Sequence, residues 1–362
     1  MAGNIKRKIV LADGTEYYGE GFGGEEEKVC EVLFSTSMIG LQELLTDPVY
    51  SGKMVVLTYP VAGCCGINDD DNQSRSLSVG ALVVRDCCDE PSNFRCTETI
   101  DELLSDNRCP GISGVDTRAL TRKLREGGTL AIITAADTTT ETALESIRAF
   151  SPEQRPAALV SCKKRWYLRP SKPEFNVAVI DCGARSSDLR CLKQLGCDLT
   201  ILPFNTTPEQ LSAIKPDGLY ISDGPGNPEL LHETIELISK LRGKLPICGE
   251  GLGFQLICLA CGGSVSRLSC GVYGGNHPIR EIKSGKIAVC AQSRDFGVLS
   301  DSLKTAELTM THTDVCDGSV QGAENKKDRI FGVQYISGGE DESFKTLFSR
   351  LKDCMREVRT NA

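Results

Sequence analysis

Residues 245–263 read LPICGEGLGFQLICLACGG, an apolar run that passes through closely spaced glycines into a second apolar run. The short run before the glycines is typical of a buried strand, and the longer run after them is typical of a helix. A strand–turn–helix elbow of this kind exposes the residue at its tip beside backbone N–H groups. The tip here is Gly251, which has no side chain. The stretch therefore predicts the backbone of a reactive site without its reactive group.

The second half of the chain repeats this alternation of strand and helix. Short apolar, strand-like runs occur at residues 176–181, 198–203, 218–222 and 245–249. Between them, residues 232–241 place Ile235, Ile238 and Leu241 on one helical face. A final helix is predicted from the spacing of Phe344, Leu347, Phe348 and Leu351. Buried strands that alternate with helices indicate a doubly wound parallel sheet.

The first half of the chain is less regular. Residues 1–150 mix strand-like runs with turn residues and one clear helix, in VDTRALTRKLREGG, which Asp116 can cap. Residues 151–175 are rich in Pro, Lys and Arg and are predicted to be a linker. We therefore expect an α/β protein: a β-rich mixed amino-terminal domain over residues 1–150, the linker, and a doubly wound parallel-sheet domain over residues 176–357.

The composition excludes several classes of protein. A chain of 362 residues with 40% hydrophobic and 25% charged residues is typical of a soluble protein of about two domains. The formal net charge of −8 argues against nucleic acid or an anionic membrane as partner. No apolar run approaches the ~20 residues of a membrane span, and the amino terminus lacks the apolar core of a signal peptide. These observations predict a cytoplasmic location.

The chain contains eighteen cysteines, including the adjacent pairs Cys64-Cys65 and Cys87-Cys88. A disulfide framework is typical of short secreted chains, which this chain does not resemble. The combined cysteine and histidine spacing of a zinc finger is absent. We therefore expect reduced thiols, many of them buried as small hydrophobic side chains, and no metal in this chain.

Two interpretations of the elbow compete. As a dinucleotide-binding loop, it has Phe254 where the third glycine belongs, and the first following acidic residue is as far away as Glu281. As a nucleophile elbow, it would stabilise an oxyanion with backbone N–H groups at the carboxyl ends of the strands. The spacing favours the second interpretation, although the nucleophile is missing.

The chain resembles the small subunit of carbamoyl phosphate synthetase. Residues 1–150 resemble its amino-terminal domain through STSMIGLQELLTDPVYS, VVLTYPVAGCCGIN, SNFR and GVDTRALTRKLREGG. Residues 176–357 resemble its class I glutamine amidotransferase domain through DGLYISDGPGNPE, the elbow, GGNHPI and FGVQY. The resemblance implies that the chain pairs with a large subunit. It also implies that ATP and Mg bind to that partner, while this chain holds no cofactor.

In that family the elbow reads G-[IV]-C-L-G-H-Q. Its cysteine attacks the amide of glutamine, assisted by the histidine and glutamate of a later G-H-P-E turn. In this chain the cysteine position is Gly251, and the histidine and glutamate positions are Ile336 and Gly338. Because glycine cannot attack a carbonyl and isoleucine cannot carry a proton, the resemblance implies that no catalytic residue remains at these positions.

The family's glutamine pocket is changed as well. Val49 replaces the serine of a T-D-P-S-Y stretch, and Phe254 replaces the histidine beside the nucleophile. We expect these side chains, with Tyr335 and Ile336, to fill the former site, so that glutamine binds weakly or not at all. The vestigial pocket keeps the residues Gly224, Gly226, Leu252, Gln255 and Phe296.

Cys248 is the candidate for a relocated nucleophile, but its place in a buried strand favours a core side chain. Three functions stay open. The chain is a pseudo-glutaminase that docks and supports an ammonia-using large subunit, an active glutamine-hydrolysing subunit, or a free-standing binding protein that uses the emptied pocket. The empty elbow tip favours the first.

Overall fold

Two units make up the chain, in a computed structural model that describes residues 5–127, 129–337 and 347–361. The first unit comprises Met1–Glu153 together with Ser269–Gly274, and the second comprises Gln154–Leu268 together with Gly275–Ala362. The short second segment of the first unit comes from the middle of β15 (Val265–Glu281). The sequence pattern did not predict that residues 269–274 belong to the first unit, because the domain over residues 176–357 was expected to be continuous.

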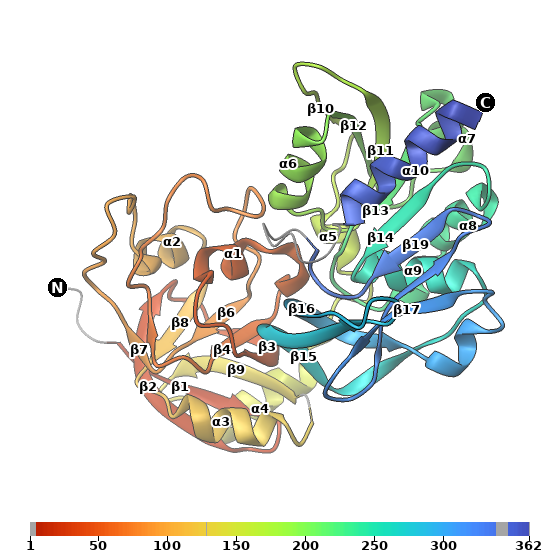
Figure 1. Cartoon of the computed structure of the whole chain (residues 1–362). Coiled ribbons are helices and arrows are strands. Elements are labelled where there is room, and N and C mark those ends of the chain that lie inside the picture. The colour runs from red at the N-terminus through yellow and green to blue at the C-terminus, as the bar shows by residue number, and fades with distance from the viewer. Residues whose placement is uncertain (1–4, 128, 338–346, 362) are drawn as a thin grey trace. The chain divides into compact units, whose positions relative to one another are not determined.

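A closed barrel forms the centre of the first unit (Figure 1). Its strands are β1 (Lys6–Leu11), β2 (Glu16–Gly23), β3 (Lys28–Ser35), β4 (Met54–Leu57), β6 (Ala81–Val83), β8 (Pro110–Ser113) and β9 (Thr129–Ala135). Their order around the barrel is β1-β2-β8-β6-β4-β3-β9. Strands β3, β4, β6 and β8 pair in parallel, and the other pairs are antiparallel. The β-rich mixed architecture is confirmed.

Shorter elements complete this unit: α1 (Leu41–Thr46), η1 (Pro48–Tyr50), α2 (Ile100–Asp106), α3 (Thr117–Leu124), α4 (Thr140–Ala149) and the strand pair β5 (Val61–Ala62) and β7 (Asp86–Cys87). Helix α3 is the one predicted from the sequence. The Asp116 carboxylate accepts a hydrogen bond from the Ala119 N–H at 3.0 Å, which confirms the predicted cap. Leu120 and Leu124 of this helix are buried in the core of the barrel.

One sheet runs through the second unit, in the order β10-β12-β11-β13-β14-β19-β18-β17-β15-β16. Its parallel strands are β12 (Cys197–Pro203), β11 (Phe175–Asp181), β13 (Gly218–Ile221), β14 (Ile247–Glu250) and β19 (Ile330–Val333). Antiparallel pairings add β10 (Trp166–Leu168) at one side and β18 (Val320–Asn325), β17 (Thr309–Asp314) and β15 at the other. The predicted parallel sheet is confirmed, and it has antiparallel extensions on both sides.

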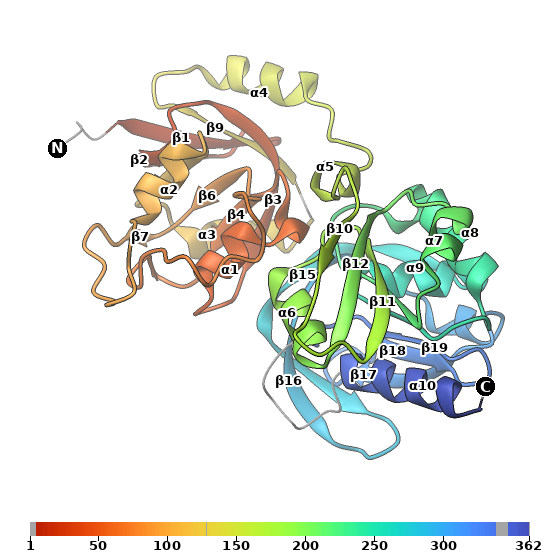
Figure 2. The same cartoon turned by 90° about the horizontal axis from the view of Figure 1, so that it is seen from above.

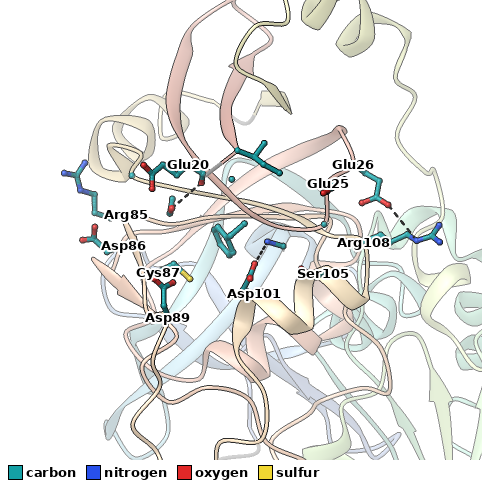
Figure 3. A pocket seen from close by; sticks show the side chains of 17 residues that line it. Glu20, Glu25, Glu26, Arg85, Asp86, Cys87, Asp89, Asp101, Ser105 and Arg108 are labelled. Atoms are coloured by element: carbon teal, nitrogen blue, oxygen red, sulfur yellow. Dashed lines mark hydrogen bonds and ion pairs between the residues drawn. The ribbon is translucent and has the colours of Figure 1, made fainter. Parts of the chain in front are cut away.

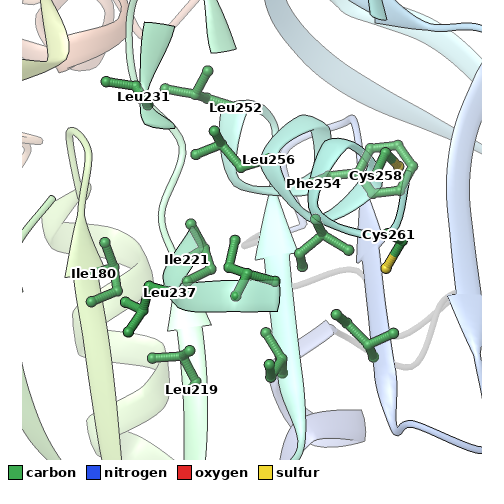
Figure 4. Close-up of a cluster of buried hydrophobic side chains, with 14 of the residues drawn as sticks. Ile180, Leu219, Ile221, Leu231, Leu237, Leu252, Phe254, Leu256, Cys258 and Cys261 are labelled. Atoms are coloured by element: carbon green, nitrogen blue, oxygen red, sulfur yellow. The ribbon is translucent and has the colours of Figure 1, made fainter. Parts of the chain in front are cut away.

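Helices cover both faces of the parallel strands (Figure 2). One face packs against α7 (Pro208–Ile214), α8 (His232–Leu241) and α9 (Leu252–Ala260), and the other packs against α6 (Ser186–Gln194) and α10 (Leu347–Asn361). Because side chains alternate along a strand, Leu219 and Ile221 lie in the first core while Tyr220 lies in the second. Figure 4 shows the first core, to which Phe254 and Leu256 of α9 and Ile221 of β13 contribute. Of the helix predicted at the end of the chain, Phe344 lies outside the described residues.

The predicted linker, residues 151–175, contains regular structure. It holds α5 (Ala157–Val160) and the edge strand β10, in which Trp166 pairs with Ile201 of β12. The composition suggested a linker because an edge strand is half exposed and tolerates charged residues that a central strand excludes. These residues are therefore part of the second unit's sheet from Trp166 to Leu168 and not a plain connection.

Truncating the cap of α3 tests how this helix begins. We expect Asp116→Ala to lower the free energy of unfolding by about 1 kcal/mol, because the Ala119 N–H loses its acceptor. Asp116→Asn keeps a side-chain oxygen and should cost a few tenths of a kcal/mol at most. Urea denaturation followed by circular dichroism measures both variants. Equal losses for the two would contradict the capping role.

Candidate active site

The elbow joins β14 to α9 through Gly251, whose backbone dihedrals are φ 53° and ψ −114°. Side chains on an L-residue disfavour positive φ, whereas glycine adopts this conformation without strain. The Gly251 N–H donates to the Val333 carbonyl at 2.9 Å, which ties the tip to the end of β19. The predicted strand–turn–helix elbow is therefore present, with an unstrained residue at its tip.

The carboxylate of Asp223, just beyond the end of β13, lies against this tip. Its Oδ1 accepts hydrogen bonds from the backbone N–H groups of Gly224 and Leu252, each at 2.8 Å. Only 3% of Asp223 is exposed to solvent. An ideal Cβ on Gly251 would overlap Oδ1 and Cγ of Asp223 and would lie 2.5 Å from its Oδ2. A side chain on residue 251 and the Asp223 carboxylate in this position therefore exclude each other.

Three of the predicted pocket residues, Gly224, Gly226 and Leu252, lie on the loop after β13 or at the start of α9. Gly224 passes so close to the backbone of Cys182 that a Cβ would overlap the Cys182 carbonyl oxygen. Gly226 has φ 106°, and its Cβ would lie 2.8 Å from the ring of Pro156. Leu252 is the first residue of α9, with its side chain in the core. The two glycines therefore set the course of the backbone. The N–H groups of Gly224 and Leu252 both point at the Asp223 carboxylate.

Gln255 and Phe296 lie together on the other side of the elbow. The Gln255 Nε2 donates to the Phe296 carbonyl of β16 (Ile287–Val298) and to the Gln334 side chain, both at 3.0 Å. Gln255 is buried, and Phe296 is half-buried. Phe296 therefore takes part through its backbone, and Gln255 connects α9 to two segments of the sheet.

The family's base position lies in the segment after β19. The Ile336 N–H donates to the Ala291 carbonyl at 2.9 Å. The next residue, Ser337, donates to the Glu250 carboxylate from its N–H at 3.1 Å and also from its hydroxyl. Gly338 lies outside the described residues. The structure thus brings this segment to the elbow strand, but neither Gly251 nor Ile336 carries a group that can attack or exchange a proton.

A network of buried charges, which the pattern of the sequence did not predict, lies beside the elbow. The Arg185 guanidinium pairs with the Glu250 carboxylate and with Asp188, the latter at 3.2 Å, and all three residues are at most 2% exposed. The Tyr220 hydroxyl donates to Asp188 at 3.1 Å. Burial, reinforced by the charge of Asp188, raises the pKa of Tyr220 well above its usual value. Charges are buried at this depth only where they are paired.

A sequence signal for these residues exists. Asp223 lies two residues after an apolar strand, and Glu250 is the last residue of another, and both strands are otherwise free of charge. The carboxyl ends of neighbouring parallel strands meet at one edge of the sheet, where ligands bind in this fold class. Carboxylates at two such ends were therefore candidates for a common site.

Two aromatic residues expected to fill the pocket lie elsewhere. The Phe254 ring is fully buried in the core beneath α9 (Figure 4), close to Gly332 of β19. The Tyr335 ring lies in the core on the opposite face of the sheet, 5.6 Å from the His312 ring. Val49 is buried in the core of the first unit. The expectation that Phe254 and Tyr335 fill the former site was wrong, because Phe254 is on the face of α9 that packs against the sheet and Tyr335 packs into the core on the other face.

Cys248 is a core side chain, as predicted. It is fully buried on the face of the sheet that packs against α10, whereas the elbow helix α9 covers the other face. Burial raises the pKa of its thiol well above the usual value, which opposes formation of the nucleophilic thiolate. Burial also lowers the pKa of His277 and of His312. Cys248 therefore lies on the face of the sheet away from the elbow helix, with a thiol that resists ionisation.

Other features add no chemistry to the elbow. All eighteen cysteines belong to the described residues and are free thiols. Among the described residues, no three His, Cys, Asp or Glu side chains are grouped so that they could hold a metal ion. The helices in the described part of the chain are too short or too polar to cross a membrane.

A cavity of about 800 Å³ lies in the first unit (Figure 3). Its charged lining residues are Glu20, Glu25, Glu26, Arg85, Asp86, Asp89, Asp101 and Arg108. Part of this charge is engaged within the unit, since Asp101 accepts from the Gly23 N–H at 2.6 Å and Arg108 lies 3.8 Å from Glu26. None of the predicted site residues lines this cavity.

Comparisons with known proteins agree with the elbow and the sheet. Residues 178–335 match the family model for glutamine amidotransferase class-I, which is the class that this fold and elbow define. Residues 9–133 match the family model for the carbamoyl-phosphate synthase small chain, CPSase domain. The chain therefore belongs to the carbamoyl phosphate synthase small chain family.

Full-length relatives support this assignment. The carbamoyl phosphate synthase small chain of Bacillus cereus (strain ZK / E33L) is 40% identical over 370 residues, covering 99% of this chain and 100% of the relative. The carbamoyl phosphate synthase pyrimidine-specific small chain of Halalkalibacterium halodurans is 38% identical over 362 residues, covering 99% of each chain. Among solved structures, a glutamine amidotransferase of Thermotoga maritima matches with a TM-score of 0.37 and 14% identity, covering 51% of this chain and 84% of that one.

The buried ion pair beside the elbow gives a stability test. We expect Glu250→Ala to lower the free energy of unfolding by up to about 3–5 kcal/mol, because buried Arg185 loses one of its two carboxylate partners and keeps only Asp188. Glu236→Ala removes a carboxylate from an exposed pair with Lys240 and should cost less than about 1 kcal/mol. Urea titrations of both variants measure the difference. Similar costs would show that the Glu250 pair is not structurally important.

Alkylation tests the position of Cys248. Because its thiol is buried and its pKa is raised, native protein treated with iodoacetamide at pH 8 should leave Cys248 unmodified. The exposed thiols of Cys64, Cys65 and Cys316 serve as internal controls and should be modified. Peptide mass spectrometry reads each site. Rapid modification of Cys248 in folded protein would support a relocated nucleophile.

Proposed function

We propose that this chain is a small subunit without glutaminase activity that docks and supports an ammonia-using large subunit of carbamoyl phosphate synthase. The observation that carries the proposal is the elbow tip: Gly251 has no nucleophile, and Ile336 stands where the base would be. Nucleophile and base act as a unit in such sites, so the loss of both removes covalent catalysis altogether.

The partner supplies the rest of the reaction. ATP, Mg and bicarbonate bind to the large subunit, and ammonia from solution replaces the ammonia that glutamine hydrolysis would provide. Glutamine binds this chain weakly or not at all. The alternative, an active glutamine-hydrolysing subunit, is supported by the intact elbow backbone alone.

Docking is supported by the first unit. The stretches that resemble the family most closely there also carry exposed apolar side chains, with Ile39 at 88% and Phe94 at 95% exposure. Contiguous exposed apolar surface is typical of sites that bind another protein, so these two side chains are the candidate contacts with the partner. An interface of the stable kind would bury upwards of ~2,000 Å² and would stabilise both chains by mass action.

Co-expression with a large subunit tests both parts of the proposal. We expect the two chains to co-elute in size-exclusion chromatography. The complex should form carbamoyl phosphate from ammonium, bicarbonate and ATP, with no glutamate released from glutamine above the buffer rate. Separate elution at micromolar concentrations would favour a free-standing binding protein, and clear glutamate release would establish the active subunit instead.

Surface variants sharpen the docking test. Ile39→Asp and Phe94→Asp introduce charge on exposed apolar positions of the first unit and should weaken co-elution. Val289→Asp, at a position 63% exposed in β16 of the second unit, serves as the matched control and should leave it unchanged. Equal behaviour of the three variants would mean that Ile39 and Phe94 lie outside the interface.

A further inference from the structure

We infer that Asp223 is an internal ligand of the elbow: its carboxylate occupies the two backbone N–H donors that would hold the carbonyl oxygen of a substrate, and so closes the site to amides and esters. This inference deepens the proposed loss of glutaminase activity and rests on it. Asp223 excludes a carbonyl substrate, whereas Gly251 is the position that lacks the nucleophile.

The geometry of the donors is that of an oxyanion hole. In a nucleophile elbow one donor is the N–H of the residue after the tip, and the second comes from a neighbouring loop. Leu252 follows the tip, and Gly224 lies on the loop after the adjacent strand β13. The Leu252 N–H is also at the amino-terminal end of α9, where the helix dipole favours negative charge.

Both donors are already satisfied by one oxygen. Oδ1 of Asp223 lies 2.8 Å from each nitrogen, the length of a charge-assisted hydrogen bond. A carbonyl from solution would have to displace an acceptor that belongs to the same chain and is present at a high effective concentration. A neutral amide oxygen is also the weaker acceptor, since hydrogen bonds to an ionised group are the stronger ones.

The backbone that carries Asp223 is fixed from behind. The hydroxyl of Ser222, a fully buried residue, donates to the Asp223 carbonyl at 2.8 Å and accepts from the Cys182 N–H at 2.9 Å. The next residue, Gly224, packs so closely against Cys182 that a Cβ on it would overlap the Cys182 carbonyl. The Asp223 carboxylate is therefore held at the elbow by its own strand as well as by the donors.

Gly251 and Asp223 are a matched pair. The carboxylate occupies the space of a Cβ on residue 251, so glycine at the tip is what allows it to reach the two donors. A cysteine at the tip would force the carboxylate out of the donors and leave both N–H groups without this acceptor. Restoring the nucleophile is therefore incompatible with Asp223 in its present position, whatever base is supplied.

Coupling between the two positions tests the inference in the full-length chain. We expect Gly251→Cys to lower the melting temperature of the wild-type chain by roughly 8 °C or more, from the clash together with the positive φ. In an Asp223→Ala background the same substitution should cost less than half as much. Gly262→Cys is the matched control: its φ is +92° and nothing lies within 4 Å of its Cβ, so its cost should be equal in both backgrounds.

Formate gives an independent readout of the donors. Asp223→Ala leaves both N–H groups open, and sodium formate should raise its melting temperature by several degrees over sodium chloride of equal ionic strength. The wild-type chain should not respond. If Asp223→Ala does not fold, Asp223→Asn, which keeps an acceptor oxygen, should fold and should still reject Gly251→Cys.

Two results would overturn the inference: an equal cost of Gly251→Cys in both backgrounds, or no difference between formate and chloride on folded Asp223→Ala. These measurements read stability and anion binding, so they can fail while the proposed function stands. Glutamate release by the wild-type chain would instead refute the proposed function and leave the coupling measurement to decide the role of Asp223.

Discussion

The backbone of Gly251 is the constraint on which the site depends. Its dihedrals, φ 53° and ψ −114°, turn the chain from β14 into α9 within one residue and point the Leu252 N–H at the end of β13. The Gly251 N–H bond to the Val333 carbonyl ties the same turn to β19. Three neighbouring strands thus meet at one residue. Glycine adopts these dihedrals without strain and leaves room beside it for the Asp223 carboxylate.

Buried charged side chains surround this turn. Asp223 lies on the N–H donors, and Glu250 pairs with Arg185 on the adjoining side. Buried ion pairs contribute little net stability compared with apolar packing, but removing one partner is costly. A site with such a network changes only by several substitutions together. This is a physical reason why the elbow keeps its shape without a side chain at its tip.

Much of the second unit followed from periodicity. Each predicted strand from residue 176 to residue 249 is present within a few residues, and the helix at residues 232–241 has the predicted bounds. The elbow and its empty tip were also readable, since glycine spacing and strand–helix order are local properties. The linker was less predictable, because the edge strand β10 pairs on one side only and needs no apolar pattern. The barrel of the first unit was not predicted, because its closure depends on pairing β1 with β9, more than 100 residues away.

Local pattern alone established a strand–turn–helix elbow with Gly251 at its tip, and the resemblance to a family added that this elbow is of the class I amidotransferase type. Strand order decided what took its place. Asp223 and Glu250 are ordinary acidic residues at strand ends until β13 and β14 become neighbours, with Ile221 opposite Gly249. Likewise, Phe254 and Tyr335 read as pocket-filling residues until the two faces of the sheet send them into separate cores. Contacts between residues that are distant in sequence come from packing the whole sheet, and no local period encodes them.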